Sequence, residues 1–337
     1  MEACLIVTYR CNARCYMCNT WQHPTKKEKE FPPSLIDRIP GNLDFINITG
    51  GEPFLRDDLE EIITAALQKT KRLVVSTNGY FTERIVNIAN NFGNKIGIRI
   101  SIEGLPAAND ELRGIKNGFD HGLRTLLILR DMGIRDIGFG ITVSDRNAKD
   151  MIDLYRLAAA MGLEFATAVT HNSFYFHKDD NFFADQGMVA GEFEKISYEL
   201  LKTNRPKNWF RAYFNMGLAN KVKGGDRPLP CEVGTDVFFL DPHGNILPCN
   251  GSDVPLIMGN LHEQSFDEIW QGQHAVEIRN HVKKCTKQCW MIGSASPAMK
   301  KNVKNPILWI INNKLQIMTD KESISVLSPV EFKSWLK

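Results

Sequence analysis

Short apolar runs alternate with longer segments of helical period over the first half of the chain. Branched and aromatic residues dominate six runs that we predict to be strands: Ala3–Thr8, Phe45–Thr49, Leu73–Thr77, Ile96–Ser101, Ile137–Val143 and Phe165–Thr170. Apolar residues recur three and four apart in four intervening segments that we predict to be helices: Asp58–Lys69, Phe81–Phe92, Gly118–Met132 and Ala148–Met161. This alternation is typical of an α/β fold with a parallel sheet, and six such units predict a partial (β/α)6 barrel.

Beyond residue 186 the alternation stops. Two helices are expected at Val189–Thr203 and Asn208–Lys223, followed by the Gly- and Pro-rich linker Gly224–Pro230. A hairpin is then predicted from Val237–Leu240 and Asn245–Leu247, and a helix from Phe266–Val282. The expected domains are therefore a barrel with bridging helices at 1–223, a small hairpin and helix domain at 224–295, and a helical tail at 296–337.

Composition narrows the function classes. The 337 residues are 43% apolar, which is enough for substantial cores, and 41 Lys and Arg against 39 Asp and Glu leave a formal net charge of +2. We therefore expect no nucleic-acid partner. No run approaches the roughly 20 apolar residues that span a bilayer, and no signal peptide is evident, so the sequence predicts a cytoplasmic protein that does not span a membrane.

The eight cysteines are concentrated towards the two ends of the chain. They stand at positions 4, 11, 15, 18, 231, 249, 285 and 289. In a reducing compartment, clustering of this kind favours metal binding over disulfides. Cys4 stands inside the first predicted strand, away from both groups, and is expected to be a small buried apolar residue.

The first group, Cys11, Cys15 and Cys18, follows the first predicted strand directly. Three thiolates on one loop would leave one iron of a four-iron cluster open, whereas a structural zinc site usually has four closed ligands. An iron–sulfur cluster therefore fits this loop better than zinc. The motif Cys-Asn-Ala-Arg-Cys-Tyr-Met-Cys resembles that of the radical S-adenosylmethionine (SAM) superfamily, although Met17 stands where that family usually has an aromatic residue, and Tyr16 is one place earlier.

The resemblance extends over residues 3 to about 150, through four further segments at predicted strand ends. It implies that SAM binds the open iron of a [4Fe-4S] cluster and is cleaved by one electron to a 5′-deoxyadenosyl radical. It also implies that Glu52 accepts from the SAM ammonium and that Arg113 pairs with the SAM carboxylate. The cofactor contacts implied in this way are Tyr16, Met17, Gly50, Gly51, Glu52, Pro53, Ser76, Asn78, Ser101, Glu103 and Arg113.

The second group consists of Cys231, Cys249, Cys285 and Cys289, and it brackets the predicted hairpin and helix. From local spacing alone, a closed zinc site and one fully ligated [4Fe-4S] cluster are both open. The arrangement resembles the SPASM and twitch extensions of radical SAM enzymes, in which the full SPASM pattern has seven cysteines. This resemblance favours a second [4Fe-4S] cluster, which would accept an electron or have a structural role.

The resemblance implies an oxidoreductase of the dehydrogenase type that abstracts hydrogen from its substrate. No leader-peptide domain is seen before the first strand, so we expect a small molecule such as a sugar, a cyclitol or a nucleotide-linked intermediate. Cross-linking or epimerisation of a peptide is the alternative, and a non-catalytic iron–sulfur scaffold is the alternative from another class. An external electron donor such as flavodoxin or ferredoxin is the implied partner.

Substrate contacts are expected at the ends of the fifth and sixth strands and in the segment that leads to the second domain. The candidates are Thr142, His171, Asn172, Tyr175, His177 and Arg211. The apolar segment 306–318 is expected to dock on the barrel, with dimerisation or a membrane surface as alternatives.

Overall fold

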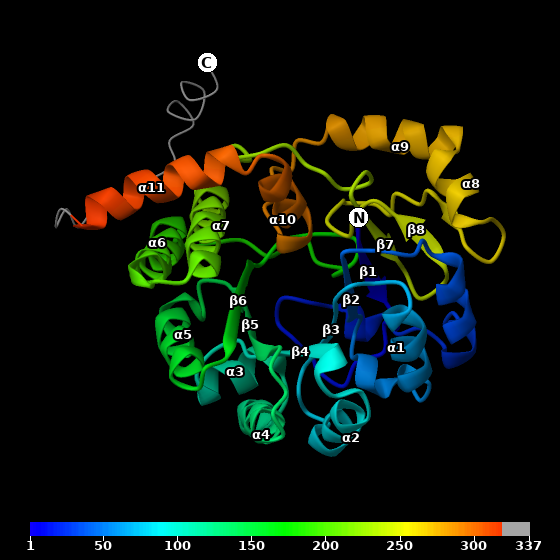
Figure 1. The fold of residues 1–337 in the computed structure, drawn as a ribbon, viewed down its shortest axis with the longest axis horizontal. Coiled ribbons are helices and arrows are strands. Elements are labelled where there is room, and N and C mark those ends of the chain that lie inside the picture. Colours follow the sequence, from blue (N-terminus) through cyan, green and yellow to red (C-terminus); the bar gives the residue numbers. More distant parts are fainter. Residues whose placement is uncertain (319–337) are drawn as a thin grey trace.

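A single curved sheet organises the chain (Figure 1). The computed structural model describes residues 1–318, and all statements on structure below refer to this part of the chain. The six expected parallel strands are present as β1 (Glu2–Ile6), β2 (Phe45–Thr49), β3 (Leu73–Thr77), β4 (Ile96–Ser101), β5 (Ile137–Val143) and β6 (Glu164–Val169). They lie in sequence order with every neighbouring pair parallel, so their carboxyl ends share one rim. The predicted partial (β/α)6 barrel is confirmed.

Helices cover the outer face of these strands. They are α1 (Leu59–Leu67), α2 (Thr82–Phe92), α3 (Pro106–Arg113), α4 (Gly118–Asp131) and α5 (Met151–Ala160), of which α3 was not predicted. Apolar residues spaced three and four apart face the sheet: in α1, Leu59, Ile62, Ile63 and Ala66 are all buried. Short 3-10 helices lie at Thr20–Gln22, Lys27–Lys29, Pro33–Arg38, Pro53–Leu55, Gly93–Lys95 and Ala148–Asp150.

The inner face of the sheet is more open and more polar than the outer face. In β2 the outer residues Ile46 and Ile48 are fully buried, whereas the alternate residues Phe45, Asn47 and Thr49 are only partly buried. Every second residue of a strand points to the same side, so Asn47 shares its face with Ser76 of β3, whose hydroxyl donates to the Asn47 side-chain oxygen at 2.9 Å. The concave side of the barrel therefore offers polar groups.

The sheet does not end where the second domain was expected to begin. After α6 (Gln186–Lys202) and α7 (Pro206–Val222), strand β7 (Val237–Leu240) pairs in parallel with β1, and β8 (Asn245–Leu247) and β9 (Gly259–Asn260) follow antiparallel. The predicted hairpin is confirmed, but it extends the barrel sheet to nine strands in the order β6-β5-β4-β3-β2-β1-β7-β8-β9. The sheet therefore includes strands from both sides of the linker at residues 224–230, where the domain boundary was expected.

The helix predicted at Phe266–Val282 is two helices, α8 (Phe266–Gln271) and α9 (Gln273–Lys283). Gly272 between them has extended backbone angles, which ends one helix and starts the next. Helices α10 (Ile292–Lys301) and α11 (Lys304–Met318) complete the described chain.

Segment 306–318 docks on the molecule, but its main contacts are with the bridging helices α6 and α7 rather than with the barrel strands. Helix α11 lies across α6 and α7, with Trp309 and Ile310 buried, while Ile307 and Ile311 on its other side are exposed (Figure 1). Among residues 1–318, no helix has the length and apolar character that crossing a membrane requires.

Candidate metal centres

The first three cysteines lie on the loop that follows β1, at the rim formed by the strands' carboxyl ends. Two backbone hydrogen bonds tie this loop to the end of α3: Arg14 N donates to Arg113 O at 3.0 Å and Tyr16 N to Leu112 O at 2.8 Å. Within the loop, Cys18 N donates to Cys15 O at 3.2 Å. The unpredicted helix α3 thus holds the cysteine loop in place.

The thiols of this loop are close enough to influence one another. Burial raises the pKa of Cys11 to about 12 and that of Cys15 to about 11, and in each case a neighbouring cysteine contributes to the rise. The positive charge of Arg113 acts in the opposite direction on both thiols. Since a metal binds the thiolate form, bound iron would displace these protons.

Arg113 provides the test of whether an anionic ligand fits this site. Its guanidinium pairs with Glu103, Nη1 to Oε1 at 2.9 Å, but its Nε is buried and has no hydrogen-bond partner in the described chain. Burial opposes its charge, yet Cys15, Glu103, Cys11 and Glu52 together outweigh that effect and raise the pKa of Arg113. An orphan donor on a permanent cation close to the thiols of Cys11 and Cys15 fits a carboxylate such as that of SAM.

Gly50 and Gly51 let the second loop approach the cysteine loop closely. A side-chain carbon on Gly51 would lie 2.3 Å from Arg10 O, and one on Gly50 would lie 2.4 Å from Thr8 O. The atoms that come close to these glycines are backbone atoms of the cysteine loop and its start. Gly51 N donates to Thr8 O at 2.7 Å, and Glu52 N donates to Arg10 O at 2.8 Å. The Gly-Gly-Glu-Pro segment therefore locks two rim loops together, which the sequence argument did not anticipate.

Glu52 is completely buried, and three donors of the chain already bond its carboxylate. Oε1 accepts from Phe54 N at 3.1 Å and from the Thr77 hydroxyl at 2.7 Å, and Oε2 accepts from Asn78 N at 2.7 Å. Burial raises its pKa, and these donors partly offset the rise. Oε2 has one donor and keeps a lone pair for a further one, such as the ammonium group that the family resemblance implies. Pro53 is buried beside it.

The other expected cofactor contacts lie along the same rim with partners of their own. The Asn78 side-chain amide donates to the Asn12 side-chain oxygen at 2.7 Å, next to Cys11. Glu103 accepts from Thr142 N at 2.6 Å in addition to Arg113, so it serves the arginine as an anchor. Ser101, the last residue of β4, pairs with Gly140 in the ladder.

Tyr16 and Met17 point to different environments. Met17 is buried, with 7% of its surface exposed, whereas Tyr16 is 38% exposed and lies under the side chains of Arg146 and Lys178. Of the two, Met17 is the residue turned towards the interior. The aromatic ring one place earlier in the sequence therefore does not take over its position.

Thr142 lies in β5 beside Glu103, and four of the other five pocket candidates share one segment. His171, Asn172, Tyr175 and His177 lie on the segment after β6, which contacts the cysteine loop: Asn19 N donates to Phe176 O at 2.8 Å and the Thr20 hydroxyl to Tyr175 O at 2.9 Å. Tyr175 itself is buried and donates to Gly50 O at 3.0 Å, and His177 stacks on His23 with ring centroids 3.9 Å apart. The segment is thus packed against the rim rather than standing free as a lid.

Arg211 is the exception, and its expected pocket role does not agree with the structure. It pairs with Glu164, the first residue of β6, which lies at the opposite end of that strand from the rim. Burial raises the pKa of Glu164, but Arg211 and Lys207 outweigh this and lower it. In the sequence, Arg211 stands in a helix of the segment that leads to the second domain, where substrate contacts were expected. In the structure, this turn of α7 lies at the amino ends of the strands.

His171 is the candidate with an unused polar atom. Its Nε2 is buried without a hydrogen-bond partner in the described chain, and its Nδ1 lies 3.4 Å from Val169 O. Burial lowers its pKa to about 4, so the ring is neutral near neutral pH. Asn181, which the sequence argument missed, joins this segment to the cysteine loop by donating to both His171 O and Met17 O, at 3.1 and 3.2 Å. No local signal marks such a bridge, because its partners are far apart in sequence.

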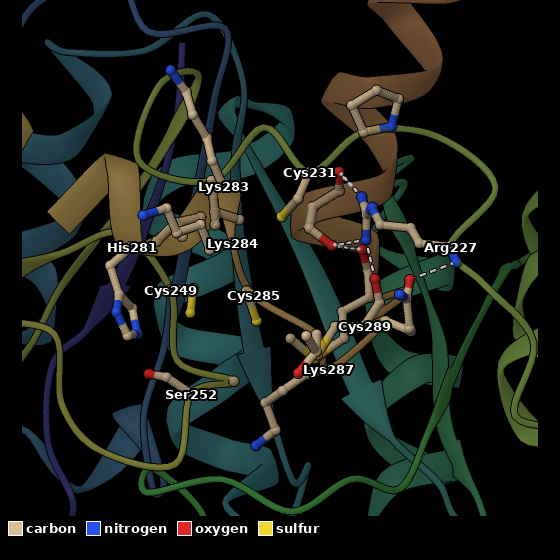
Figure 2. Close-up of a pocket in the computed structure, with 18 of the residues that line it drawn as sticks. Arg227, Cys231, Cys249, Ser252, His281, Lys283, Lys284, Cys285, Lys287 and Cys289 are labelled. Carbon is tan, nitrogen blue, oxygen red and sulfur yellow. Dashed lines mark hydrogen bonds between the residues drawn. The ribbon is translucent and has the colours of Figure 1, made fainter. Parts of the chain in front are cut away.

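The four C-terminal cysteines surround one cavity of about 910 Å³. Figure 2 shows their sulfur atoms facing the same space, with Cys231 directly after the linker, Cys249 from the segment after β8, and Cys285 and Cys289 from the loop after α9. Burial raises the pKa of Cys249 and Cys289, whereas Cys231 and Cys285 are exposed. The site thus has a buried side and a side open to solvent.

The arrangement of these thiols bears on the choice between zinc and an iron–sulfur cluster. Tetrahedral zinc with bonds of about 2.3 Å brings thiolates to within about 4 Å of one another. The four thiols line one cavity, which has room for a four-iron cluster. Four thiolates are a usual donor set for such a cluster and also for structural zinc.

Comparisons with known protein families agree with both sites. Residues 5–158 match the model of the radical SAM superfamily, and residues 231–290 match an iron–sulfur cluster-binding domain, SPASM. The first match contains the cysteine loop and every expected cofactor contact. The second contains all four C-terminal cysteines.

Individual relatives point to two kinds of chemistry. An AdoMet-dependent heme synthase of Nitratidesulfovibrio vulgaris is 28% identical over 306 residues, which cover 81% of this chain and 79% of that protein. The sporulation killing factor maturation protein SkfB of Bacillus subtilis is 23% identical over 291 residues, covering 83% and 67%. The crystal structure of SuiB from Streptococcus suis has a TM-score of 0.60 at 16% identity, covering 83% of this chain and 67% of SuiB, which shows a shared fold.

Proposed function

Since the chain belongs to the radical SAM superfamily and carries a SPASM domain, we propose that it is a radical SAM enzyme that modifies a peptide. The two domains imply SAM and [4Fe-4S] clusters as cofactors, which when bound would supply one-electron cleavage of SAM and hydrogen-atom abstraction. The remaining steps of the proposal concern what the residues of this chain do.

In the barrel, Cys11, Cys15 and Cys18 would hold the cluster whose open iron binds SAM. Arg113 would direct its orphan Nε to the SAM carboxylate while Glu103 keeps the guanidinium in place. Glu52 would accept from the ammonium with its remaining lone pair, and the bonds from Thr77 and Asn78 would hold the carboxylate in position. These groups are supplied by loops at the ends of neighbouring strands, so one rigid rim would position the whole cofactor.

The observation that carries the peptide assignment is the pair of peptide-linked relatives. SkfB is named for the maturation of a killing factor, and SuiB has been solved bound to its precursor peptide SuiA, in a structure that covers 86% of this chain at a TM-score of 0.59. The expected sugar, cyclitol or nucleotide-linked substrate has no counterpart among the relatives described above, which are a heme synthase, a maturation protein and a protein solved with a precursor peptide. The dehydrogenase type likewise lacks support from these names.

Heme-related chemistry is the second candidate, because the heme synthase of Nitratidesulfovibrio vulgaris matches over 79% of its own length. In either case, the four C-terminal thiols would hold one fully ligated [4Fe-4S] cluster, and an external flavodoxin or ferredoxin would deliver electrons. A cytoplasmic location belongs to the same proposal, because all eight cysteines are free and such clusters need reducing conditions.

Deuterium transfer tests the substrate class. Peptides encoded by short open reading frames beside the gene, translated with perdeuterated amino acids, would be incubated with the reduced, anaerobically reconstituted protein and SAM. Iron coproporphyrin III with deuterated propionate side chains would be incubated in parallel. We expect singly deuterated 5′-deoxyadenosine from a peptide and none from the porphyrin. Deuterium transfer from the porphyrin alone would replace the peptide proposal with the heme-related one.

Iron analysis tests the two cluster sites separately. Reconstituted protein is expected to contain about eight irons, and a variant with Cys11, Cys15 and Cys18 all changed to Ala about four, because each cubane holds four. EPR of the reduced protein should show two signals in the parent and one in the variant. Four irons with bound zinc in the parent, falling to none in the variant, would make the C-terminal site a zinc site.

A further inference from the structure

Arg227 lies at the edge of the C-terminal cavity, in the linker that leads to Cys231 (Figure 2). Its side chain donates to four oxygen atoms: Leu229 O at 2.7 Å, Cys289 O, the Ser294 hydroxyl at 3.1 Å and Ser294 O at 2.8 Å. Its own backbone N–H donates to the side chain of Gln288 at 2.7 Å. One residue therefore connects the chain before the first cysteine of the site to the loop that carries the last one.

The loop after Cys289 is anchored in turn to the barrel. Trp290 is fully buried, its indole N–H donates to Phe214 O of α7 at 2.9 Å, and its ring lies under the Arg227 guanidinium, 5.0 Å from the ring centroid. A side-chain carbon on Gly217 of α7 would stand 2.2 Å from the indole nitrogen, so only glycine leaves room for this ring. The position of Arg227 is thus set by contacts that reach the bridging helices.

The charge of Arg227 faces the cysteines. The oxygen atoms that it bonds within the described chain are carbonyls and a hydroxyl, so no carboxylate bonded to it neutralises its charge. Burial lowers the pKa of Arg227, and attraction from Cys231, Cys289 and Cys285, three of the four thiols of the site, and from Glu232 offsets part of that effect. Glu232 in turn pairs with Lys301 at 2.7 Å.

We propose that Arg227 is a positioning residue of the C-terminal cluster, which clamps two of its ligand-bearing segments and raises the cluster's midpoint potential with a fixed, partly buried positive charge. This inference rests on the four-cysteine cluster site proposed above. Adding an electron makes a thiolate-bound cluster more negative, so a nearby cation stabilises the reduced form. In a partly buried site, water screens that attraction only weakly.

Two substitutions separate the charge from the clamp. Arg227→Gln removes the charge, whereas Arg227→Lys keeps the charge and loses the forked set of donors. Arg279→Gln is the matched control, because Arg279 also stacks on a tryptophan, Trp270 at 4.8 Å, and donates to the carbonyls of Gly234 and Trp270 in the same domain. Burial alone lowers its pKa, with no contribution from a cysteine.

The measurement is an EPR-monitored redox titration of each reconstituted full-length variant, together with its iron content. Arg227→Gln should shift the midpoint potential of the C-terminal cluster to more negative values, with about a tenfold lower ratio of reduced to oxidised cluster at a given potential, which corresponds to about 59 mV. Arg227→Lys should stay near the parent potential with a broadened EPR signal, and Arg279→Gln should match the parent.

Each remaining outcome has a defined meaning. Loss of about four irons in both Arg227 variants, with retention in Arg279→Gln, would support the clamp, and loss in Arg227→Gln alone would support the charge. Parent-like iron and potential in Arg227→Gln would overturn the proposal, and so would equal loss of iron in all three variants. A parent protein with no second cluster signal would reject the cluster site itself, before Arg227 is tested.

Discussion

Two cysteines near the amino terminus have different surroundings at the scale of single residues. Cys4 lies within β1, where burial raises the pKa of its thiol to about 12 and Asn47 bonds it, whereas Cys15 lies on the rim loop beside Cys18 and Arg113. Both residues carry the same thiol group, and they differ only in position: Cys4 lies within the strand and Cys15 on the loop that follows it. Substituting each in turn therefore tests whether the rim is the site of SAM cleavage.

Cys15→Ala should abolish production of 5′-deoxyadenosine from SAM and remove about four irons, because a cluster with two remaining thiolates is not held. Cys4→Ala is the matched control and should keep both properties, at a cost in stability of about 1 kcal/mol for the lost packing. Both variants would be assayed anaerobically with a chemical reductant. Unchanged SAM cleavage by Cys15→Ala would contradict the assignment of the first cluster.

The lowered pKa of the buried His171 ring leads us to expect that the stability of the fold depends on pH. Its pKa is lowered by burial to about 4 in the folded chain, against about 6.5 when unfolded, so below pH 6.5 the unfolded chain binds the extra proton. The stabilisation is complete above pH 6.5 and is lost as the pH falls towards 4, by up to about 3 kcal/mol.

Urea unfolding at pH 5.5 and 7.5 under anaerobic conditions should therefore show a smaller difference for His171→Asn than for the parent. The same difference in both proteins would mean that other groups carry the pH dependence.

At the scale of elements, the interface between α7 and the loop after Cys289 is held by one close contact. Gly217 and Gly191 are both glycines inside bridging helices, α7 and α6, but a side-chain carbon would meet Trp290 at the first and nothing within 4 Å at the second. The helical pattern in the sequence does not distinguish them. Their different surroundings come from the packing of distant segments.

Gly217→Ala should destabilise the protein by about 1–3 kcal/mol, because the added methyl group forces the buried Trp290 ring to move. Gly191→Ala should stabilise it by about 0.5–1 kcal/mol, because alanine loses less backbone freedom in a helix. Chemical denaturation followed by tryptophan fluorescence compares the two variants. Destabilisation by both, to a similar extent, would contradict the contact with Trp290.

At the scale of the whole molecule, β1 pairs with β2 on one side and with β7 on the other, so the two matched domains share one sheet. A chain that ends at residue 223 would leave β1 as an open edge with unpaired backbone groups. We expect this shortened chain to aggregate on expression, and a separately supplied chain of residues 224–318 to restore solubility in part. A monomeric, folded chain 1–223 that cleaves SAM at the parent rate would contradict this dependence.

Much of the architecture followed from local pattern. Strand and helix periods predicted the six parallel strands with ends within two residues of those observed, because each element buries a face that its own sequence defines. Helix α3 was missed, since Pro106–Arg113 carries few apolar residues, and the break at Gly272 was missed inside an otherwise helical pattern. Helix α3 and the break at Gly272 depend on tertiary contacts or backbone angles, and the spacing of apolar residues in the sequence does not show these.

By itself, the sequence determined the fold class and singled out the residues that we propose carry the chemistry, because the spacing of Cys11, Cys15 and Cys18 and the order of the strand-end segments are local properties of the chain. Only the tertiary structure decided how these residues are held. It turned Arg211 away from the rim, paired Glu103 with Arg113, joined β7 to β1 and placed Arg227 beside the C-terminal thiols. The physical reason is that hydrogen bonds, ion pairs and packing connect segments tens to hundreds of residues apart, whose approach is set by the packed fold rather than by neighbouring residues.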